Sequence, residues 1–262
     1  SIDRLNEKYS NQILKDKEVL LVLDQNIPPK FKDMMTKDLS GLSSKFHTIE
    51  ILPSEENKNG VTLDKIHSKL ISKRYSRDCY LVGLGGGITC DITGFAAATY
   101  QRGVNFILFP STLLSQVDAS VGGKTAINHP QGKNMIGAFH QPKQVFADVS
   151  LLSFLPDMEV SNGLSEVIKH ALISDKEYFE WLETNMEDII SLEPKALERA
   201  ITRSIEIKAE IVAKDEKEKG IRKYLNFGHT FGHAIELYGG FKEFIHGQSV
   251  AIGMLMAMKL SC

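Results

Sequence analysis

The first part of the chain alternates short apolar runs with helix-like patterns. Runs rich in apolar and β-branched residues predict strands at residues 18–24, 46–52, 79–84, 104–109 and 145–149. Apolar residues at helical spacing predict a helix over 63–71, and small residues predict another through 96–98. Pro28 and Pro29 predict a loop after the first strand. This order is typical of a mostly parallel sheet covered by helices.

The pattern changes after Pro156, where helical periodicity replaces the short β-branched runs. Acidic and basic residues also pair more densely at helical spacing there. We expect helices at about 157–174, 177–191, 194–215, 227–238 and from 247 onward. The sequence therefore predicts an α/β domain with a mostly parallel sheet at 1–156 and an all-α domain at 157–262.

Composition narrows the possible functions. The 262 residues are 42% hydrophobic, enough for a substantial core, and the formal net charge of -2 gives no overall attraction for nucleic acid. Because no apolar run reaches the length of a bilayer span and the first residues lack a signal-peptide core, we expect a cytoplasmic protein without membrane contact. The three cysteines lack the paired spacing of a zinc or redox motif, so we expect them to be reduced.

Residues 116–137 form a glycine-rich segment between apolar runs. Glycines let a backbone approach a ligand closely, and isolated polar groups between buried strands normally need a partner. The polar residues of this kind are Asp118, Lys124, Asn128, Lys133 and Asn134. We interpret the segment that carries them as one that folding alone does not need, and we expect it to bind a polyhydroxylated, anionic small molecule.

Gly85-Gly86-Gly87 and Asp91 lie where a predicted strand meets a helix. Amide groups and the helix dipole at such a turn can hold a pyrophosphate. The spacing differs from Gly-x-Gly-x-x-Gly, however, and a tight turn followed by a first-turn acid explains it equally well. Asp24, at the end of the first strand, could likewise contact a ribose or serve as a turn residue.

Two histidines, His229 and His233, are four residues apart and hence on one face of a predicted helix. His246 precedes a further helix, and Glu166 lies inside an earlier one. Because imidazole and carboxylate donors suit Zn²⁺, the pattern favours a metal site over isolated histidines. Spacing alone would make both His229 and His233 ligands.

Three basic residues have a plain alternative to a functional role. Lys169 shares a helix face with Glu166, and a simple salt bridge would explain that spacing. Lys208 and Arg222 flank the charged cluster 214–219 and fit solvated surface bases. The residues alone do not separate these alternatives.

Six motifs occur in an order that is more specific than any one of them. They are Leu84-Gly-Gly-Gly-Ile-Thr-Cys-Asp91, Tyr100-Gln-Arg-Gly103, Pro110-Ser-Thr-Leu-Leu-Ser-Gln-Val-Asp-Ala-Ser-Val-Gly-Gly-Lys124, Gly132-Lys-Asn-Met-Ile-Gly137, Glu166-Val-Ile-Lys169 and Asn226-Phe-Gly-His-Thr-Phe-Gly-His233. This series closely resembles the 3-dehydroquinate synthase family. The resemblance implies a homodimeric, NAD- and Zn²⁺-dependent lyase of the shikimate pathway. It also implies an N-terminal NAD-binding domain, a C-terminal helical metal- and substrate-binding domain, and an active site in the cleft between them.

The resemblance also implies roles for individual residues. The zinc ligands become Glu166, His229 and His246, with Co²⁺ or another divalent ion as an alternative, and His233 becomes a substrate contact. The other implied catalytic and substrate residues are Lys124, Lys133, Asn134 and Asn226 on the phosphate side, Arg102 from a neighbouring subunit, Lys208 and Arg222 at the carboxylate, Asp118 and Lys169 at the ring hydroxyls, and Glu218. The implied NAD-binding residues are Asp24, Asn26, Glu55, Lys58, Gly85, Gly86, Gly87, Asp91, Ser111, Thr112 and Leu114, together with Asp118 and Lys124.

The implied substrate is a sugar acid phosphate, 3-deoxy-D-arabino-heptulosonate 7-phosphate. Its C5 hydroxyl is oxidised by NAD⁺, phosphate is eliminated, NADH returns the hydride, and an aldol closure yields 3-dehydroquinate. Three alternatives stay open: a sister cyclase of the 2-deoxy-scyllo-inosose or valiolone type, a polyol dehydrogenase, and a nucleotide-binding module without turnover.

The chain departs from the family pattern in three places. Cys90 and Ser111 stand where the family commonly has glycine and threonine, and both are small enough to be tolerated. The family also has further helices and a phosphate-side lysine, in an Asp-Lys-Lys segment, after the position where this chain stops. We therefore expect this chain, with an incomplete second domain, to be part of a longer enzyme.

Overall fold

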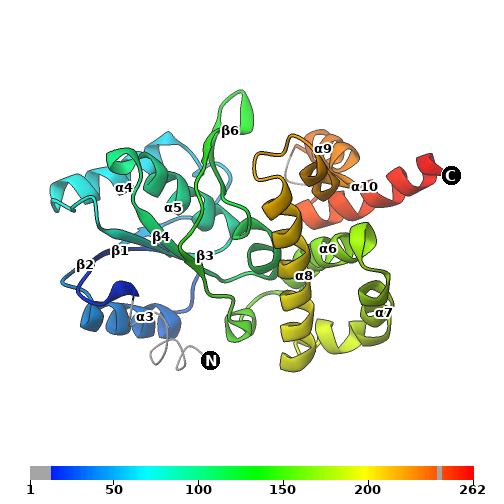
Figure 1. Ribbon diagram of the computed structural model, residues 1–262, viewed down its shortest axis with the longest axis horizontal. Helices are drawn as coiled ribbons and strands as arrows, with labels where there is room; N and C mark the ends of the chain where they lie inside the picture. Colours follow the sequence, from blue (N-terminus) through cyan, green and yellow to red (C-terminus); the bar gives the residue numbers. More distant parts are fainter. Residues whose placement is uncertain (1–12, 241–243) are drawn as a thin grey trace. The chain divides into compact units, whose positions relative to one another are not determined.

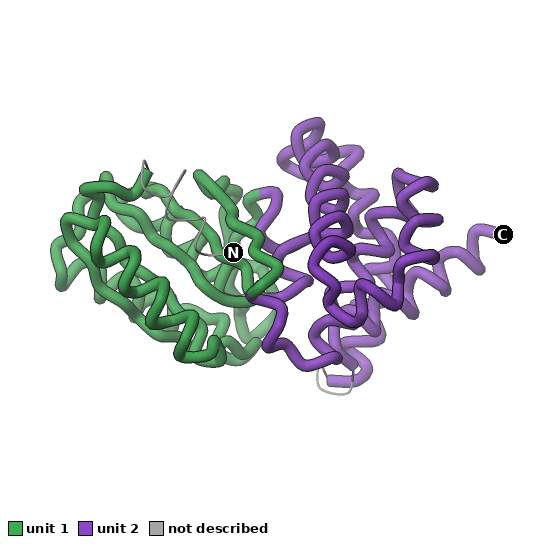
Figure 2. Tube along the Cα trace, turned by 90° about the horizontal axis from the view of Figure 1, so that it is seen from below, with its two compact units in different colours: residues 1–111, 123–150 green, residues 112–122, 151–262 purple. Residues whose placement is uncertain are grey.

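The structure is a computed structural model, and it describes residues 13–240 and 244–262 (Figure 1). The chain folds into two compact units (Figure 2). The first contains residues up to 111 together with 123–150, and the second contains 112–122 together with 151–262. The short segment 112–122 thus belongs with the helices that follow it, and the domain limits 1–156 and 157–262 stay a prediction.

The first unit is built on a parallel sheet. In the described residues its five strands have the order β2-β1-β3-β4-β7, and they are β1 (Glu18–Asp24), β2 (Lys45–Ile51), β3 (Tyr80–Gly85), β4 (Asn105–Pro110) and β7 (Gln144–Val145). All neighbouring pairs are parallel, as predicted, and β7 is shorter than expected. The direction of strand order reverses between β1 and β3. In sheets of this kind, ligands bind outside the carboxyl ends of the strands at such a reversal.

Helices cover both faces of this sheet. Helices α4 (Gly60–Ser72) and α5 (Gly87–Thr99) lie on one face, and α3 (Pro29–Leu42) lies on the other (Figure 1). Leu20 and Val22 of β1 belong to the core with α4 and α5, as the alternation of side chains along a strand requires. Helix α3 was not predicted from the sequence, because Pro28 and Pro29 indicated a loop. Pro29 instead begins the helix, where its missing N–H leaves no hydrogen bond unmade.

The glycine-rich segment 116–137 has regular structure that the sequence analysis did not predict. It begins in a π-helical turn, η3 (Ser115–Ala119), and continues into an antiparallel hairpin of β5 (Lys124–His129) and β6 (Gly132–Phe139). Val117 and Ile127 are buried. The view that folding does not need this segment is therefore wrong, because it supplies core side chains and a strand pair.

The second unit is helical in the described residues. Its main helices are α6 (Asp157–Ser174), α7 (Lys176–Ile190), α8 (Pro194–Lys214), α9 (His229–Tyr238) and α10 (His246–Ser261), and each begins within two residues of its predicted start. No helix in the described ranges has both the length and the apolar character that a membrane span needs. The predicted fold class, an α/β part with a mostly parallel sheet and an all-α part, is confirmed for the described residues.

Candidate active site

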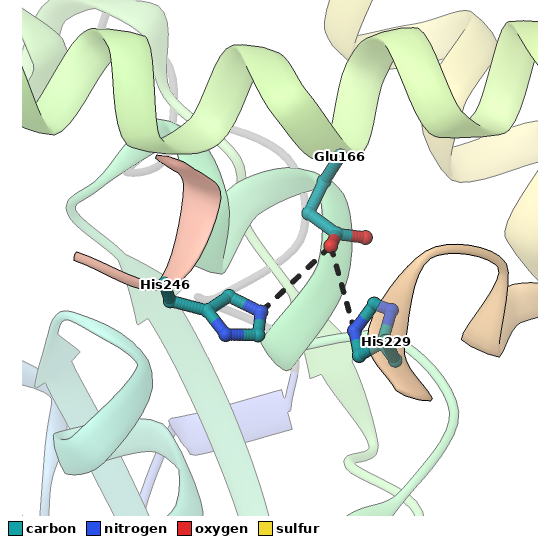
Figure 3. A group of neighbouring side chains, drawn as sticks. All are labelled: Glu166, His229 and His246. Carbon is teal, nitrogen blue, oxygen red and sulfur yellow. Dashed lines mark ion pairs between the residues drawn. The ribbon is translucent and has the colours of Figure 1, made fainter. Parts of the chain in front are cut away.

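Glu166 lies in the middle of α6, and its carboxylate is completely buried. Its Oε1 atom is 3.7 Å from Nε2 of His229 and 3.8 Å from Nε2 of His246. Figure 3 marks both pairs with dashed lines. Within residues 13–240 and 244–262, this oxygen has no hydrogen-bond partner. A buried carboxylate oxygen of this kind is strongly unfavourable unless something compensates its charge. Its position beside two imidazole nitrogens indicates a cation-binding site.

A close backbone contact places His229 at the site. It is the first residue of α9, directly after Gly228, whose φ is +80°. A side chain on Gly228 would lie 2.8 Å from the amide nitrogen of Met254 and 2.9 Å from the carbonyl oxygen of Val250, both on α10. Only glycine lets α9 and α10 approach so closely, so local backbone conformation and helix packing together fix where His229 begins its helix.

A side chain of α6 holds the start of α10. His246 is the first residue of α10, and the amide of the next residue, Gly247, donates to Oδ1 of Asn162 at 2.6 Å. Asn162 and Glu166 are four residues apart, so they lie on one face of α6. One face of α6 therefore both binds the backbone at the start of α10, through Asn162, and contacts the imidazole of His246, through Glu166.

A second set of buried groups lies next to Glu166. The Oε2 atom of Glu166 accepts a hydrogen bond from Lys169, one turn later on α6. Lys208 on α8 donates at 2.6 Å to both the backbone oxygen and Oδ1 of Asp118 in η3. His170 is completely buried, lies 4.0 Å from Oδ1 of Asp118, and has no hydrogen-bond partner among the described residues. Each carboxylate of the site is thus paired with an ammonium group.

Burial and neighbouring charges shift the pKa values of this cluster. Burial alone would raise the pKa of Asp118, but attraction to Lys208 and Lys169 outweighs it and holds that pKa below its usual range. Burial, followed by repulsion from Lys169, lowers the pKa of His170 to about 3 and that of His229 to about 4. At neutral pH Asp118 is therefore ionised and both imidazoles are neutral, which is the form that can donate a lone pair to a metal.

Two groups of donor atoms lie within 4.8 Å of one another in the described part of the chain: Glu166, His229 and His246, and Asp118, Glu166 and His170. A tetrahedral Zn²⁺ with bonds of about 2.1 Å holds its ligand atoms about 3.4 Å apart, close to the spacings in the first group. In the second group, Lys169 and Lys208 already bind carboxylate oxygens, and their charges oppose a further cation. The first group therefore fits a metal, and its three ligands leave one position for substrate, as a catalytic zinc requires.

His233 lies one turn after His229 on α9, with the two ring centroids 5.4 Å apart. It belongs to neither donor group, so the structure brings His246 to Glu166 in the place that spacing alone gave to His233. Nearby in sequence, Nδ2 of Asn226 donates to Oε1 of Glu218 at 2.9 Å, which joins two further predicted substrate residues.

Arg222, in the short helix η5 (Ile221–Asn226), is buried rather than solvated. Its guanidinium group donates to the carbonyl oxygens of Gly122 at 2.9 Å and of Glu216 at 2.5 Å. A side chain on Gly122 would lie 2.5 Å from Nη2 of Arg222, so the glycine allows this contact. Burial lowers the pKa of Arg222, yet a guanidinium stays charged at neutral pH. Neither Lys208 nor Arg222 is therefore a simple surface base.

In the first unit, Asp24 ends β1 at the reversal of strand order. Its carboxylate accepts hydrogen bonds from the amides of Asn26 at 2.7 Å and Gly86 at 3.4 Å, and burial raises its pKa. A side chain on Gly85 would lie 2.6 Å from Cβ of Asp24, so the turn requires glycine there. The close approach of Asp24 thus accounts for glycine at position 85, the last residue of β3. The start of α5, at Gly87, supplies the positive helix end that an anion would need, and nucleotide binding stays a prediction.

Lys58 connects this turn region to the hairpin. It is buried, and its Nζ donates to Oδ2 of Asp91 at 2.5 Å and to Oδ1 of Asn134 at 2.6 Å. Asn128 accepts from the amide of Asn134 at 2.9 Å and donates to Oε2 of Glu55 at 2.7 Å. Residues that are far apart in the sequence therefore form one polar network in the first unit, and Asp91 pairs with Lys58 and lies beyond the first turn of α5.

The other predicted residues of the first unit lie around this network. Lys133 is 3.8 Å from Oε2 of Glu55, Lys124 is exposed at the start of β5, and the amide of Ser111 donates to Gly85 at 2.9 Å. Arg102 is exposed with a φ of +68°, a strained conformation for a residue with a side chain.

Besides Asp118, the residues Thr112 and Leu114, which are predicted to bind NAD, belong to the second unit. The hydroxyl of Thr112 is 2.9 Å from that of Ser115, and Leu114 precedes the turn η3. Thr112 and Leu114 thus make contacts typical of the start of a helix, which is a local role in folding. Their role in NAD binding stays a prediction.

Comparisons with known proteins agree with this combination of fold and site. The family model for the N-terminal part of 3-dehydroquinate synthase matches residues 48–162, and the model for the C-terminal part matches 163–262. A 3-dehydroquinate synthase of Acidithiobacillus ferrooxidans is 51% identical over 93% of this chain and 67% of its own length.

Several solved structures share the fold, among them two cyclases. A 2-deoxy-scyllo-inosose synthase complexed with carbaglucose-6-phosphate, NAD⁺ and Co²⁺ is 30% identical, with a TM-score of 0.88 over 95% of this chain and 68% of its own. A 2-epi-5-epi-valiolone synthase of Streptomyces hygroscopicus with NAD⁺ and Zn²⁺ bound is 27% identical, with a TM-score of 0.88 over 95% of this chain and 70% of its own. The fold and the carboxylate–imidazole site thus define the class of sugar phosphate cyclases.

Within that class, the chain belongs to the 3-dehydroquinate synthase family, since both halves match its models and a curated member is 51% identical. The chain is therefore an enzyme, a lyase of the cyclising type.

Several buried polar residues of the site were not predicted from the sequence. His170 follows Glu166 by four residues, so helical periodicity could have placed it on the same face of α6. Glu236 follows His229 by seven residues and could have been placed in the same way on α9. Asn162 left no such signal, because its role depends on where the start of α10 lies in space.

Proposed function

We propose that the chain converts 3-deoxy-D-arabino-heptulosonate 7-phosphate into 3-dehydroquinate and phosphate, a step of the shikimate pathway and so of chorismate and aromatic amino acid biosynthesis. Membership of the family supports this reaction. The structural observation that carries it is the buried Oε1 of Glu166, which lies beside Nε2 of His229 and His246 and has no hydrogen-bond partner in the described residues. Such an oxygen suits a catalytic metal better than a structural ion pair.

Glu166, His229 and His246 would hold a divalent ion, which we propose to be Zn²⁺ or, as in one of the similar structures, Co²⁺. When bound, the ion supplies a Lewis acid that lowers the pKa of a substrate hydroxyl. NAD would bind at the carboxyl ends of β1 and β3, near Asp24 and Gly85, and it supplies the acceptor and later the donor of a hydride. The bound cofactors of the similar structures support both proposals.

The charged groups beside Glu166 would hold the ring hydroxyls of the substrate. Asp118 is ionised and can accept hydrogen bonds from hydroxyl groups, and Lys169 can donate them. Both are fixed by ion pairs before any ligand binds, since Lys208 holds Asp118 and Glu166 holds Lys169. Such preorganised charges reduce the reorganisation that the reaction would otherwise require.

The substrate carboxylate and phosphate need cations. We propose Lys208 and Arg222 for the carboxylate, because both are buried, close to the segment 118–122, and rich in donors. The groups proposed for the phosphate and for further contacts are Lys124, Lys133, Asn134, Asn226, His233 and Glu218, with Arg102 acting from a neighbouring subunit.

The experiment that tests this function compares phosphate release from 3-deoxy-D-arabino-heptulosonate 7-phosphate, glucose 6-phosphate and sedoheptulose 7-phosphate, with NAD⁺ and Zn²⁺ present. We expect release from the first substrate only and no net NADH, because each turnover returns the hydride. Glu166→Gln is expected to abolish release, while Glu210→Gln, an exposed acid on α8, serves as the matched control.

Each of the other outcomes would assign the chain a different function. Turnover of glucose 6-phosphate or sedoheptulose 7-phosphate alone would indicate a sister cyclase, and net NADH without phosphate would indicate a polyol dehydrogenase. Binding of NAD and metal without turnover of any of the three would leave a nucleotide-binding module.

We also propose a homodimer located in the cytoplasm. The support for the dimer is the family resemblance together with the exposed position of Arg102, whose proposed role lies in a neighbouring subunit. Light scattering of the purified protein tests the dimer.

A further inference from the structure

The two imidazoles near Glu166 present the same nitrogen to it and use the other nitrogen differently. Nε2 of each ring lies near Oε1 of Glu166, at 3.7 Å for His229 and 3.8 Å for His246. Nδ1 of His229 is 3.3 Å from the backbone oxygen of Phe227, whereas Nδ1 of His246 is 3.0 Å from Oε1 of Glu236. One ring is therefore held by a carbonyl and the other by a carboxylate.

Glu236 is placed by the geometry of α9. It follows His229 by seven residues, which is close to two helical turns, so it lies on the same face as His229. Its side chain is 9% exposed, and α9 packs closely against α10, which begins at His246. A buried carboxylate in this position is unfavourable unless it is paired, and His246 provides a donor for it.

The hydrogen bond to Glu236 decides which nitrogen of His246 carries a proton. A carboxylate accepts but does not donate, so the neutral ring must place its proton on Nδ1. Nε2 then keeps its lone pair and points it toward Glu166, the direction that a metal ligand needs. Without Glu236, the ring could rotate or carry its proton on Nε2, and either change would remove the lone pair from the site.

We infer that Glu236 is a positioning residue, which holds His246 in the orientation and tautomer that bind a divalent cation. This inference rests on the proposed metal site and adds a residue that does not itself touch the ion. Phe227 performs the same task for His229 through its backbone, so no side-chain substitution can remove that contact. Substitution of Glu236 therefore changes the orientation of His246 while His246 itself stays in place.

The test is a titration of metal-free protein with Zn²⁺ in competition with a chromophoric chelator. We expect Glu236→Ala to weaken Zn²⁺ binding about 10- to 100-fold, the usual effect of removing a partner of a metal-bound histidine. Glu236→Gln keeps an acceptor but loses the charge, so it should recover much of the affinity. Glu210→Gln, an exposed acid of the same unit, is the matched control and should bind as the original chain does.

Two further measurements distinguish positioning from a loss of folding. Imidazole ¹H–¹⁵N spectra of the metal-free protein, recorded at a pH high enough for the ring of His246 to be neutral, should show its proton on Nδ1 in the original chain and in Glu236→Gln, and a mixture of tautomers in Glu236→Ala. The visible absorption spectrum of the Co²⁺ form should also change in Glu236→Ala, because the geometry of one ligand changes. A general loss of structure would instead appear as a lower circular dichroism signal.

The result that overturns the inference is distinct from the failure of the proposed function. If Glu236→Ala binds Zn²⁺ with unchanged affinity and keeps the Nδ1 tautomer while Glu166→Gln loses the metal, Glu236 has no positioning role and the metal site stands. If Glu166→Gln also keeps full Zn²⁺ affinity, the metal site itself is wrong.

Discussion

The two units form their candidate sites by different physical means. In the first unit, the turn after β3 depends on glycine and on backbone amides, and the buried Lys58 has both Asp91 and Asn134 as partners. In the second unit, Glu166 and His170 are completely buried, and each keeps polar atoms without hydrogen bonds in the described residues. Backbone shape therefore determines the first site, whereas buried charge determines the second.

This difference implies a difference in how stability depends on ligands. A polar network that is already paired gains little when a ligand binds, so its stability should depend little on whether a ligand is present. A buried carboxylate with an unpaired oxygen is unfavourable until a cation binds, so folding and metal binding are coupled there. The second unit should respond strongly to metal, to charge removal and to pH, and the first unit should respond weakly.

The largest effect is expected for Lys169→Met. This change leaves the buried carboxylate of Glu166 without its ammonium partner, so the free energy of unfolding of the metal-free protein should fall by about 3–5 kcal/mol. Zn²⁺ should restore much of the loss because it supplies a new positive charge. The measurement is urea unfolding with a chelator and with saturating Zn²⁺.

A matched change in the first unit serves as the control for that experiment. Lys58→Met removes a similarly buried cation, but its partner Asp91 keeps a side-chain exposure of 19%. We expect a smaller loss that Zn²⁺ does not alter. Equal losses in the two variants, or a loss in Lys169→Met that Zn²⁺ leaves unchanged, would remove the contrast between the units.

The next largest effect concerns pH. The pKa values of His170 and His229 are lowered to about 3 and about 4 from an ordinary 6.5. Between pH 6.5 and the lowered pKa of each histidine, the unfolded chain therefore binds a proton that the folded chain does not. Their contribution to stability is complete above pH 6.5 and is lost as the pH falls through that window, with a slope of about 1.4 kcal/mol per pH unit for each histidine. His170→Gln should remove one of the two slopes. Urea unfolding of both metal-free proteins between pH 6.5 and 4.5 measures the two slopes. If His170→Gln has the same slope as the original chain, the prediction is wrong.

The smallest effect on stability is expected in the first unit, for Lys133→Ala. Its 3.8 Å ion pair with Glu55 is partly exposed, so the free energy of unfolding should change by less than about 0.5 kcal/mol. If Lys133 binds the substrate phosphate, kcat/KM for phosphate release should nevertheless fall about 10- to 100-fold. Lys65→Ala, an exposed lysine on α4, is the control. A loss of stability without a loss of kcat/KM would assign Lys133 to folding instead.

Much of the fold was predictable because it depends on local patterns. Short apolar runs predicted β1 to β4, and helical periodicity predicted α6 to α10 to within two residues at their starts. The pattern failed at α3, where Pro29 resembles a loop residue but begins a helix, and at the hairpin β5–β6. Glycine and polar residues hide the alternation of that hairpin, since one side of it carries the network around Asn134.

The sequence by itself determined the fold class, the order of most elements and the donor types of the site, because these follow from periodicity, residue chemistry and the order of family motifs. The family motifs, unlike spacing alone, already indicated His246 rather than His233 as a partner of Glu166. Only the tertiary structure decided that Glu236 holds His246, and that segment 112–122 belongs with the helices. These facts depend on contacts between elements that are distant along the chain. Burial and distance arise only when those elements pack, and no local pattern of residues encodes them.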